Sequence, residues 1–210
     1  MIEQRELLTI SGLEIYIFDM DGTLYELDGD EGSFSGSSLM NRVIANSIDF
    51  VSQKEDCGLY KARKIIEEAM RDKVGISNVL SQKYGITRQD VFGNTWNIDP
   101  KNIIKQSSDA TNTILKLKQS NKRLFLLTGA PKIWMNNVLN ELNLTSIFER
   151  KISGENFQRK EEIFESLVNE FEPDSMISIG DQIQTDIIPA AKFGINTFLV
   201  TKPGDLLKLI

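Results

Sequence analysis

Short apolar segments that end in small polar residues recur along this chain, and they constrain its fold more than any other feature. Four such segments are rich in β-branched and aromatic residues, which is typical of buried strands. They are Glu14–Phe18, Arg123–Leu127, Met176–Ile179 and Thr197–Val200. Segments with helical apolar spacing lie between them, at Ala110–Gln119, Lys132–Leu142, Lys160–Glu170 and Asp186–Lys192. This alternation predicts an α/β fold, a doubly wound Rossmann-like parallel sheet with helices on both faces.

The interval from Glu26 to Lys105 breaks the alternation, because it contains no convincing apolar strand. Its first part, Asp28–Ser38, is polar and rich in Gly and Ser, which predicts a loop. Helical patterns follow at Leu39–Val51, Leu59–Lys73, Ile76–Lys83 and Thr87–Asn94. We therefore predict a Rossmann-like core made of residues 1–25 and 106–210, with residues 26–105 forming an inserted helical domain, called here the helical insertion.

Composition excludes several kinds of site and partner. The 210 residues include no His and one Cys, which rules out a Ser-His-Asp triad, a His-ligated zinc site and an internal disulfide. A formal net charge of −6 argues against a nucleic-acid partner, since phosphate contacts need clustered Lys and Arg. No apolar run reaches the roughly 18 residues of a membrane span, and the acidic N-terminus lacks a signal-peptide pattern. We therefore expect a cytoplasmic protein without a membrane partner.

Small polar and acidic residues follow three of the expected strands. They are Asp19 and Asp21 after the first, Thr128 and Gly129 after the second, and Asp181 and Asp186 after the third. Lys160 opens the helix that precedes the third. Ligands of open parallel sheets bind beyond the carboxyl ends of the strands, so we expect these side chains to converge at one edge. Each piece alone is compatible with an ordinary turn or helix cap, and their occurrence in order at strand ends is what favours a site.

Carboxylates packed in this way indicate phosphoryl chemistry around a divalent cation. Their mutual repulsion raises their pKa values unless a cation compensates, and Mg²⁺ is the usual ion beside carboxylate and phosphate. A carboxylate also serves as the covalent nucleophile in aspartyl-phosphate chemistry. A second carboxylate could act as acid and then as base, while Thr128 and Lys160 neutralise phosphoryl oxygens. This inventory explains how a chain without His could carry out acid–base catalysis.

Four motifs of this chain resemble those of the haloacid-dehalogenase-like hydrolase superfamily. They are FDMDGTLY (Phe18–Tyr25), LLTGA (Leu126–Ala130), Lys160 and GDQIQTD (Gly180–Asp186). The resemblance extends from about Leu13 to Val200, and the helical insertion falls where that superfamily places its helical cap. DGTLY, together with YGI (Tyr84–Ile86) and WNIDP (Trp96–Pro100), is similar to the pyrimidine 5′-nucleotidase-like branch.

The resemblance implies a Mg²⁺-dependent phosphoric monoester hydrolase that acts on a small phosphorylated metabolite through an aspartyl-phosphate. It implies that Asp19 is the nucleophile and that Asp21 protonates the leaving group and then activates water. Thr128, Gly129 and Lys160 would bind the phosphoryl group. Mg²⁺ would be held by the Asp19 carboxylate, the Asp21 main-chain carbonyl and Asp181. Asp186 would contact these ligands, or bind the ion through a water molecule.

Several alternatives remain open at this point. The same motifs serve a phosphomutase or phosphotransferase, a nucleotide-specific 5′-nucleotidase, and a relative that only binds a ligand. Asp21 argues against dehalogenation, because the dehalogenase members of the superfamily lack that second Asp. Specificity is expected to lie in residues 26–105. Trp96 is a candidate to line the substrate pocket, although packing in the core is the default expectation for a Trp. Trp134 is expected to pack in the core, and Tyr25 to border the site or to be an ordinary strand residue. The substrate and the oligomeric state are left open.

Overall fold

The computed structural model describes residues 12–29, 34–72 and 75–210. Three expectations fall partly outside these described residues: the first eleven residues of the predicted core, the middle of the predicted loop at 30–33, and the end of the predicted helix at residue 73. Within the described ranges, none of the helices has both the length and the apolar character that crossing a bilayer would require.

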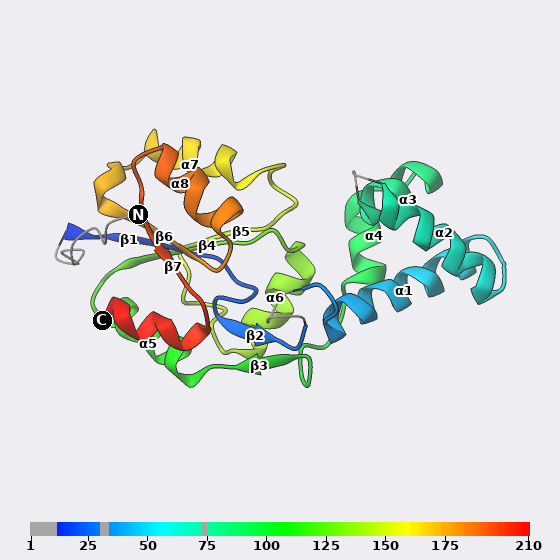
Figure 1. Ribbon diagram of the computed structural model, residues 1–210, viewed down its shortest axis with the longest axis horizontal. Helices are drawn as coiled ribbons and strands as arrows, with labels where there is room; N and C mark the ends of the chain where they lie inside the picture. The colour runs from blue at the N-terminus through cyan, green and yellow to red at the C-terminus, as the bar shows by residue number, and fades with distance from the viewer. Residues whose placement is uncertain (1–11, 30–33, 73–74) are drawn as a thin grey trace, which may run out of the picture.

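A five-stranded parallel sheet forms the centre of the described core, in the order β5-β4-β1-β6-β7 (Figure 1). Its strands are β1 (Ile15–Phe18), β4 (Arg123–Leu127), β5 (Arg150–Ile152), β6 (Met176–Gly180) and β7 (Asn196–Leu199). Phe18 at the end of β1 lies opposite both Leu126 and Ile179, so the residues that follow the three central strands emerge at the same level. The expected fold class is confirmed, and β5 is an edge strand that the sequence analysis did not predict.

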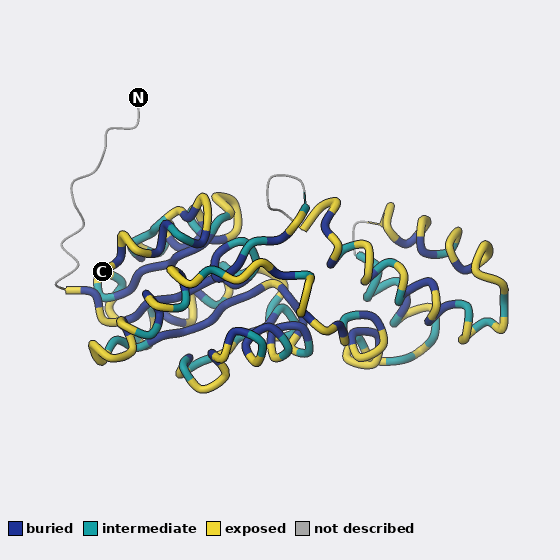
Figure 2. The backbone as a smooth tube through the Cα atoms, turned by 90° about the horizontal axis from the view of Figure 1, so that it is seen from below, coloured by how far each residue is buried: buried dark blue, intermediate teal, exposed yellow. Residues whose placement is uncertain are grey.

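Helices cover both faces of the sheet, as Figure 1 shows. One face carries α5 (Ser108–Gln119), α6 (Lys132–Glu141) and the 3₁₀ segment η5 (Pro203–Leu209). The other carries α7 (Lys160–Val168) and α8 (Ile188–Lys192), and the 3₁₀ turn η3 (Pro173–Ser175) leads into β6. Successive residues of a strand point to opposite faces, so Tyr16 and Phe18 pack under the first group of helices while Ile15 and Ile17 pack under the second. The three central strands, β1, β4 and β6, are accordingly buried along almost their whole length, whereas the edge strands β5 and β7 are partly exposed (Figure 2).

The helical insertion contains α1 (Ser38–Lys54), α2 (Leu59–Arg71), α3 (Ile76–Tyr84) and α4 (Arg88–Thr95). These helices share an apolar cluster of their own that is built around side chains such as Val51, Ile66 and Leu80. Hydroxyl side chains cap two of them at the N-terminus, Ser37 for α1 and Thr87 for α4, by accepting hydrogen bonds from otherwise unpaired backbone N–H groups. Because the cluster is separate from the core, we propose that residues 26–105 act as a domain.

A short antiparallel pair joins the helical insertion to the core. It consists of β2 (Tyr25–Leu27) and β3 (Ile104–Gln106), which lie where the chain leaves the core and where it returns. The expectation that residues 26–105 hold no strand is wrong at these two ends. Three residues are too few to show an alternating pattern, so only the pairing of the two segments identifies them as strands.

Candidate active site

The turn after β1 is shaped by a glycine that brings two segments close together. Gly22 has a φ of +79°, a left-handed conformation that favours glycine, and a Cβ at this position would lie 2.5 Å from Asp181 Oδ2. The amide of Asp19 donates to the Ile179 carbonyl at 2.8 Å, which ties the start of this turn to β6. The sequence DMDG therefore places the β1 turn directly against the end of β6.

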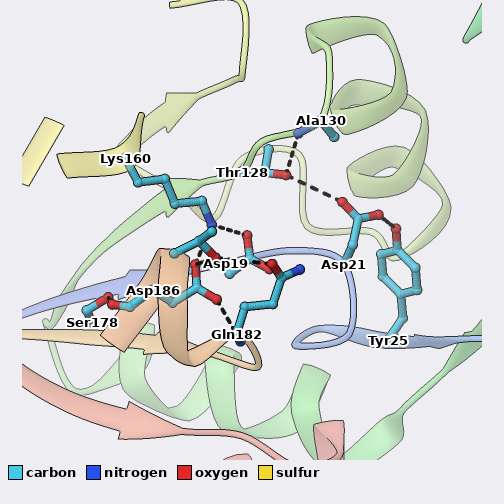
Figure 3. Close-up of polar contacts among 10 residues, drawn as sticks. Asp19, Asp21, Tyr25, Thr128, Ala130, Lys160, Ser178, Gln182 and Asp186 are labelled. Atoms are coloured by element: carbon cyan, nitrogen blue, oxygen red, sulfur yellow. Dashed lines mark hydrogen bonds and ion pairs between the residues drawn. The ribbon is translucent and has the colours of Figure 1, made fainter. Parts of the chain in front are cut away.

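Lys160 forms a buried ion pair with two carboxylates from different parts of the chain. Its Nζ lies 2.5 Å from Asp19 Oδ1 and 2.7 Å from Asp186 Oδ1, and the three side chains are 9%, 8% and 3% exposed (Figure 3). Burial alone would lower the pKa of Lys160, but the two carboxylates outweigh it and raise that pKa above its ordinary value. Lys160 therefore remains an ammonium ion at the first turn of α7.

Asp186 is held in place by the segment between β6 and α8. Asp186 lies in a π-helical turn, η4 (Ile183–Ile187). The backbone N–H of Gln182 donates to Asp186 Oδ2 at 3.0 Å. The Ser178 hydroxyl donates to the Asp186 main-chain carbonyl at 2.9 Å (Figure 3). Asp186 was expected to begin a helix, and the structure instead places it within this turn, just before α8. Its carboxylate thereby faces Lys160.

Three carboxylates gather at this edge of the sheet. One oxygen from each of Asp19, Asp181 and Asp186 lies within 4.8 Å of the other two. Burial raises the pKa of Asp19 well above its usual range, opposed by Lys160, and burial followed by the charge of Asp186 raises the pKa of Asp181 to about 6. Asp181 Oδ1 is buried and has no hydrogen-bond partner among the described residues. A single ammonium does not balance three carboxylates, and hard oxygen donors with one orphaned oxygen fit a divalent cation such as Mg²⁺.

Asp21 lies on the other side of the site and is held by two aromatic donors. The Tyr25 hydroxyl and the Trp134 indole N–H both donate to Asp21 Oδ1, the latter at 3.1 Å, and both aromatic side chains are fully buried. Asp21 Oδ2 points toward Thr128, whose hydroxyl lies 3.5 Å away (Figure 3). Burial raises the pKa of Asp21, and the hydrogen bonds from Tyr25 and Trp134 oppose that effect. One carboxylate oxygen is thus fixed and the other faces the site.

Thr128 sits in a turn that β5 supports. Its amide donates to the Ile152 carbonyl at 3.0 Å, and its hydroxyl accepts from the Ala130 amide at 3.1 Å. Gly154, just after β5, has no room for a side chain, because a Cβ there would lie 2.0 Å from the Gly129 carbonyl oxygen. The position of Thr128 and Gly129 therefore depends on an edge strand that the sequence did not reveal.

These residues open onto a cavity of about 480 Å³ between the core and the helical insertion. The core contributes Asp19, Asp21, Thr128, Gly129 and Lys160 to its lining, and the helical insertion contributes Phe34, Leu39 and Trp96. Its volume falls within the range of about 300–1,000 Å³ that is usual for small-molecule sites. Trp96, the candidate for the pocket, lies at the cavity.

The structure brings together every candidate residue named from the sequence, and their chemical roles remain predictions. Tyr25, expected either to border the site or to be an ordinary strand residue, binds Asp21, and so does Trp134, which was expected to pack in the core. Phe34 was read as part of a polar loop, yet its ring lies at the cavity. No signal in the sequence singles out Phe34 or the contact of Trp134 with Asp21, since an aromatic residue near a motif is most often a core residue.

Comparison with known proteins gives a consistent picture of the fold. No curated protein matches the sequence significantly. A HAD phosphatase from Thermococcus onnurineus is 18% identical, with a TM-score of 0.62 over 90% of this chain and 86% of that chain. A HAD family enzyme from Bacteroides thetaiotaomicron, solved with magnesium and inorganic phosphate, is 17% identical, with a TM-score of 0.52 over 90% of this chain and 94% of that one. At such identities the likeness concerns the fold alone.

The family is decided by the sequence match along most of the chain. The model of the haloacid dehalogenase-like hydrolases matches residues 13–194, a range that contains every residue of the candidate site. These residues include four of the five strands of the parallel sheet, the helical insertion and the lining of the cavity between core and insertion, and only β7 of the sheet lies beyond the matched range. The protein therefore belongs to the haloacid dehalogenase-like hydrolases and is an enzyme of that family.

Proposed function

We propose that this enzyme is a Mg²⁺-dependent phosphatase that hydrolyses a small phosphorylated metabolite through an aspartyl-phosphate on Asp19. The observation that carries the proposal is the buried Lys160 ammonium, which lies between Asp19 and Asp186 at the base of the cavity. A fixed positive charge beside a carboxylate nucleophile suits an anionic substrate, because phosphoryl transfer depends mainly on positioning and on charge stabilisation.

The first chemical step would transfer the phosphoryl group to Asp19. A carboxylate oxygen of Asp19 attacks phosphorus, the bond from phosphorus to the ester oxygen breaks, and Asp21 gives its proton to the departing alkoxide. Lys160 and Thr128 would contact the phosphoryl oxygens. Asp21 must be protonated for this step, and the upward shift of its pKa by burial supports that requirement.

The second step would release phosphate and restore the enzyme. Asp21, now ionised, takes a proton from a water molecule, the water oxygen attacks phosphorus, and the bond to Asp19 breaks. Asp21 ends protonated and Asp19 ends as a carboxylate, so the proton balance closes over one turnover.

The residues that would hold Mg²⁺ are the Asp19 carboxylate, the Asp21 main-chain carbonyl and Asp181. When bound, the ion supplies positive charge that neutralises the phosphoryl oxygens and the clustered carboxylates. Asp181 Oδ1, which has no hydrogen-bond partner in the described part of the chain, supports this assignment, as does the carboxylate cluster around it.

A hydrolysis screen with and without metal tests the proposal. We expect the purified protein to release inorganic phosphate from one or more phosphorylated sugars, nucleotides or short acids in the presence of Mg²⁺. Removal of the ion by chelation and dialysis should lower the rate at least about 100-fold, and added Mg²⁺ should restore it. Unchanged turnover after dialysis would contradict the metal requirement. Isomerised product that exceeds released phosphate would instead identify a phosphomutase.

Tyr25 and Trp134 are expected to matter because they hold Asp21. Tyr25→Phe and Trp134→Phe should each lower kcat about tenfold with KM within about twofold, since a misdirected acid slows the proton transfer but not binding. The loss should shrink for 4-nitrophenyl phosphate, whose leaving group needs little protonation.

A matched control for this prediction lies in the helical insertion. Tyr84 donates its hydroxyl to Glu55 at 3.1 Å, so Tyr84→Phe also removes a tyrosine hydrogen bond but leaves Asp21 untouched. It should keep the kcat of the unmodified enzyme. Equal kcat values for Tyr25→Phe and Tyr84→Phe would show that Tyr25 has no part in catalysis.

A further inference from the structure

We propose that the group esterified to phosphate in the substrate carries a planar aromatic ring, which packs against Phe34 and Trp96. This inference rests on the proposed phosphatase function and names the substrate class for the same site. The rings of Phe34 and Trp96 stack on each other, with centroids 5.6 Å apart and planes 10° apart, and both line the cavity that contains Asp19 and Lys160.

The backbone around each ring is fixed by hydrogen bonds. The Phe34 carbonyl accepts from the Ser37 hydroxyl at 2.7 Å, and Ser37 also caps α1. The Trp96 amide donates to the Phe92 carbonyl at 2.8 Å at the end of α4. Phe34 nevertheless remains 38% exposed. A large apolar ring that lines a cavity and stays partly exposed, rather than buried in the core, indicates a surface for a ligand.

The rest of the cavity wall favours a ring over a polyol or a second anion. Apolar residues such as Leu39 and Phe157 also line the cavity, and so do three core residues with amide side chains: Gln158, Gln182 and Gln184. The cations among the described lining residues are Lys160, which is paired with Asp19 and Asp186, and Arg159, whose side chain is 75% exposed. An aromatic ring can bury its faces against apolar side chains, and amides can donate to or accept from heteroatoms at its edge.

There is also room for substituents on the ring. A second cavity of about 280 Å³ is lined by the same two aromatic residues and by Gly129. Phe34 and Trp96 therefore stand at the boundary of both cavities, and a ring against them would have space on two sides. With the phosphoryl group at Lys160, the leaving group would extend from the core toward the helical insertion.

Paired esters that differ in the ring alone test this inference. Benzyl phosphate and cyclohexylmethyl phosphate are both primary alkyl esters, so leaving-group chemistry is nearly matched. Uridine 5′-monophosphate and ribose 5-phosphate share the same 5′ ester and differ in the base. We expect kcat/KM to favour the aromatic member of at least one pair about tenfold, the scale of one aromatic stacking contact. A preference confined to the nucleotide pair would identify the leaving group as a nucleoside. A preference that benzyl phosphate shares would show that a simpler aromatic ring is enough for recognition.

Variants at the two rings make the test specific. Trp96→Leu and Phe34→Leu should reduce the aromatic preference to about twofold, while Trp96→Phe should retain most of it. Tyr60→Leu removes an aromatic ring that is 73% exposed on α2, away from the cavity, and should leave the preference unchanged. Equal kcat/KM within both pairs, or an equal loss for all esters in Trp96→Leu, would overturn the inference and leave the phosphatase function standing.

A binding measurement separates this inference from the reaction. Calorimetry with the Asp19→Asn variant, which cannot form the aspartyl-phosphate, should show the aromatic member of at least one of the two pairs binding about tenfold more tightly than its partner. Adding Trp96→Leu should remove that difference. If wild type hydrolyses none of these esters but the binding difference is present and depends on Trp96, the phosphatase proposal fails while aromatic recognition stands. Equal binding within both pairs would overturn aromatic recognition.

Discussion

Asp19→Asn is expected to abolish phosphatase turnover, with kcat reduced at least about 10³-fold. An amide is a poor nucleophile and carries no charge, so the aspartyl-phosphate cannot form. Substrate affinity should persist, because Lys160 and Thr128 remain to contact the phosphoryl group. Phosphate release measures the loss, and mass spectrometry of acid-quenched samples should detect a phosphorylated peptide containing Asp19 in the unmodified enzyme and not in the variant.

The control for this prediction is Asp49→Asn. Asp49 is exposed on α1, so its replacement changes the net charge by the same amount without touching the site. It should retain full turnover and the phosphorylated peptide. If Asp19→Asn keeps the kcat of the unmodified enzyme, the covalent mechanism is wrong, whatever the metal dependence.

Lys160→Met is expected to destabilise the metal-free protein by about 3–5 kcal/mol, the usual cost of removing one partner from a buried ion pair. The side chains of Lys160, Asp19 and Asp186 are all less than one-tenth exposed. The variant would leave these two carboxylates and Asp181 without their ammonium. Denaturant unfolding in the presence of a chelator measures the loss, and Mg²⁺ should stabilise the variant more than the unmodified protein because the ion replaces part of the missing charge.

A second lysine provides the comparison for this experiment. Lys192 Nζ lies 2.9 Å from Glu161 Oε1, but these side chains are 56% and 28% exposed. Exposed pairs contribute little, so Lys192→Met should cost less than about 1 kcal/mol. If the two variants lose similar amounts of unfolding free energy, burial does not make the ion pair of Lys160 more important for stability than an exposed one. Activity should fall by at least about 10²-fold in Lys160→Met and stay unchanged in Lys192→Met.

Much of the core could be predicted from the sequence because its three central strands are buried on both faces. Such strands are short continuous apolar runs, so the predicted segment Arg123–Leu127 coincides with β4, and the segment from Met176 differs from β6 by one residue. The candidate residues were found for a related reason. In a parallel sheet each strand ends at the same edge, so residues that follow strands in the sequence meet in space.

Other features depended on pairing that local sequence does not express. Three short strands, β2, β3 and β5, have too few residues for a pattern and are strands because a partner binds them. The position of Phe34 at the cavity could likewise not be predicted from the loop Asp28–Ser38, because it depends on stacking against the distant Trp96. Composition marks such a segment as polar, but it does not say where one aromatic ring will lie.

The sequence by itself determined the fold class, the family motifs and which residues lie at the strand ends, because these follow from local patterns and from the geometry common to parallel sheets. The tertiary structure decided which side chains contact those residues and which residues line the cavity. Trp134 reaches Asp21 across 113 residues of chain, and Lys160 reaches Asp19 across 141. Such contacts depend on how whole helices pack on the sheet and on each other, and side-chain packing between distant segments leaves no periodic trace in the sequence that could have predicted them.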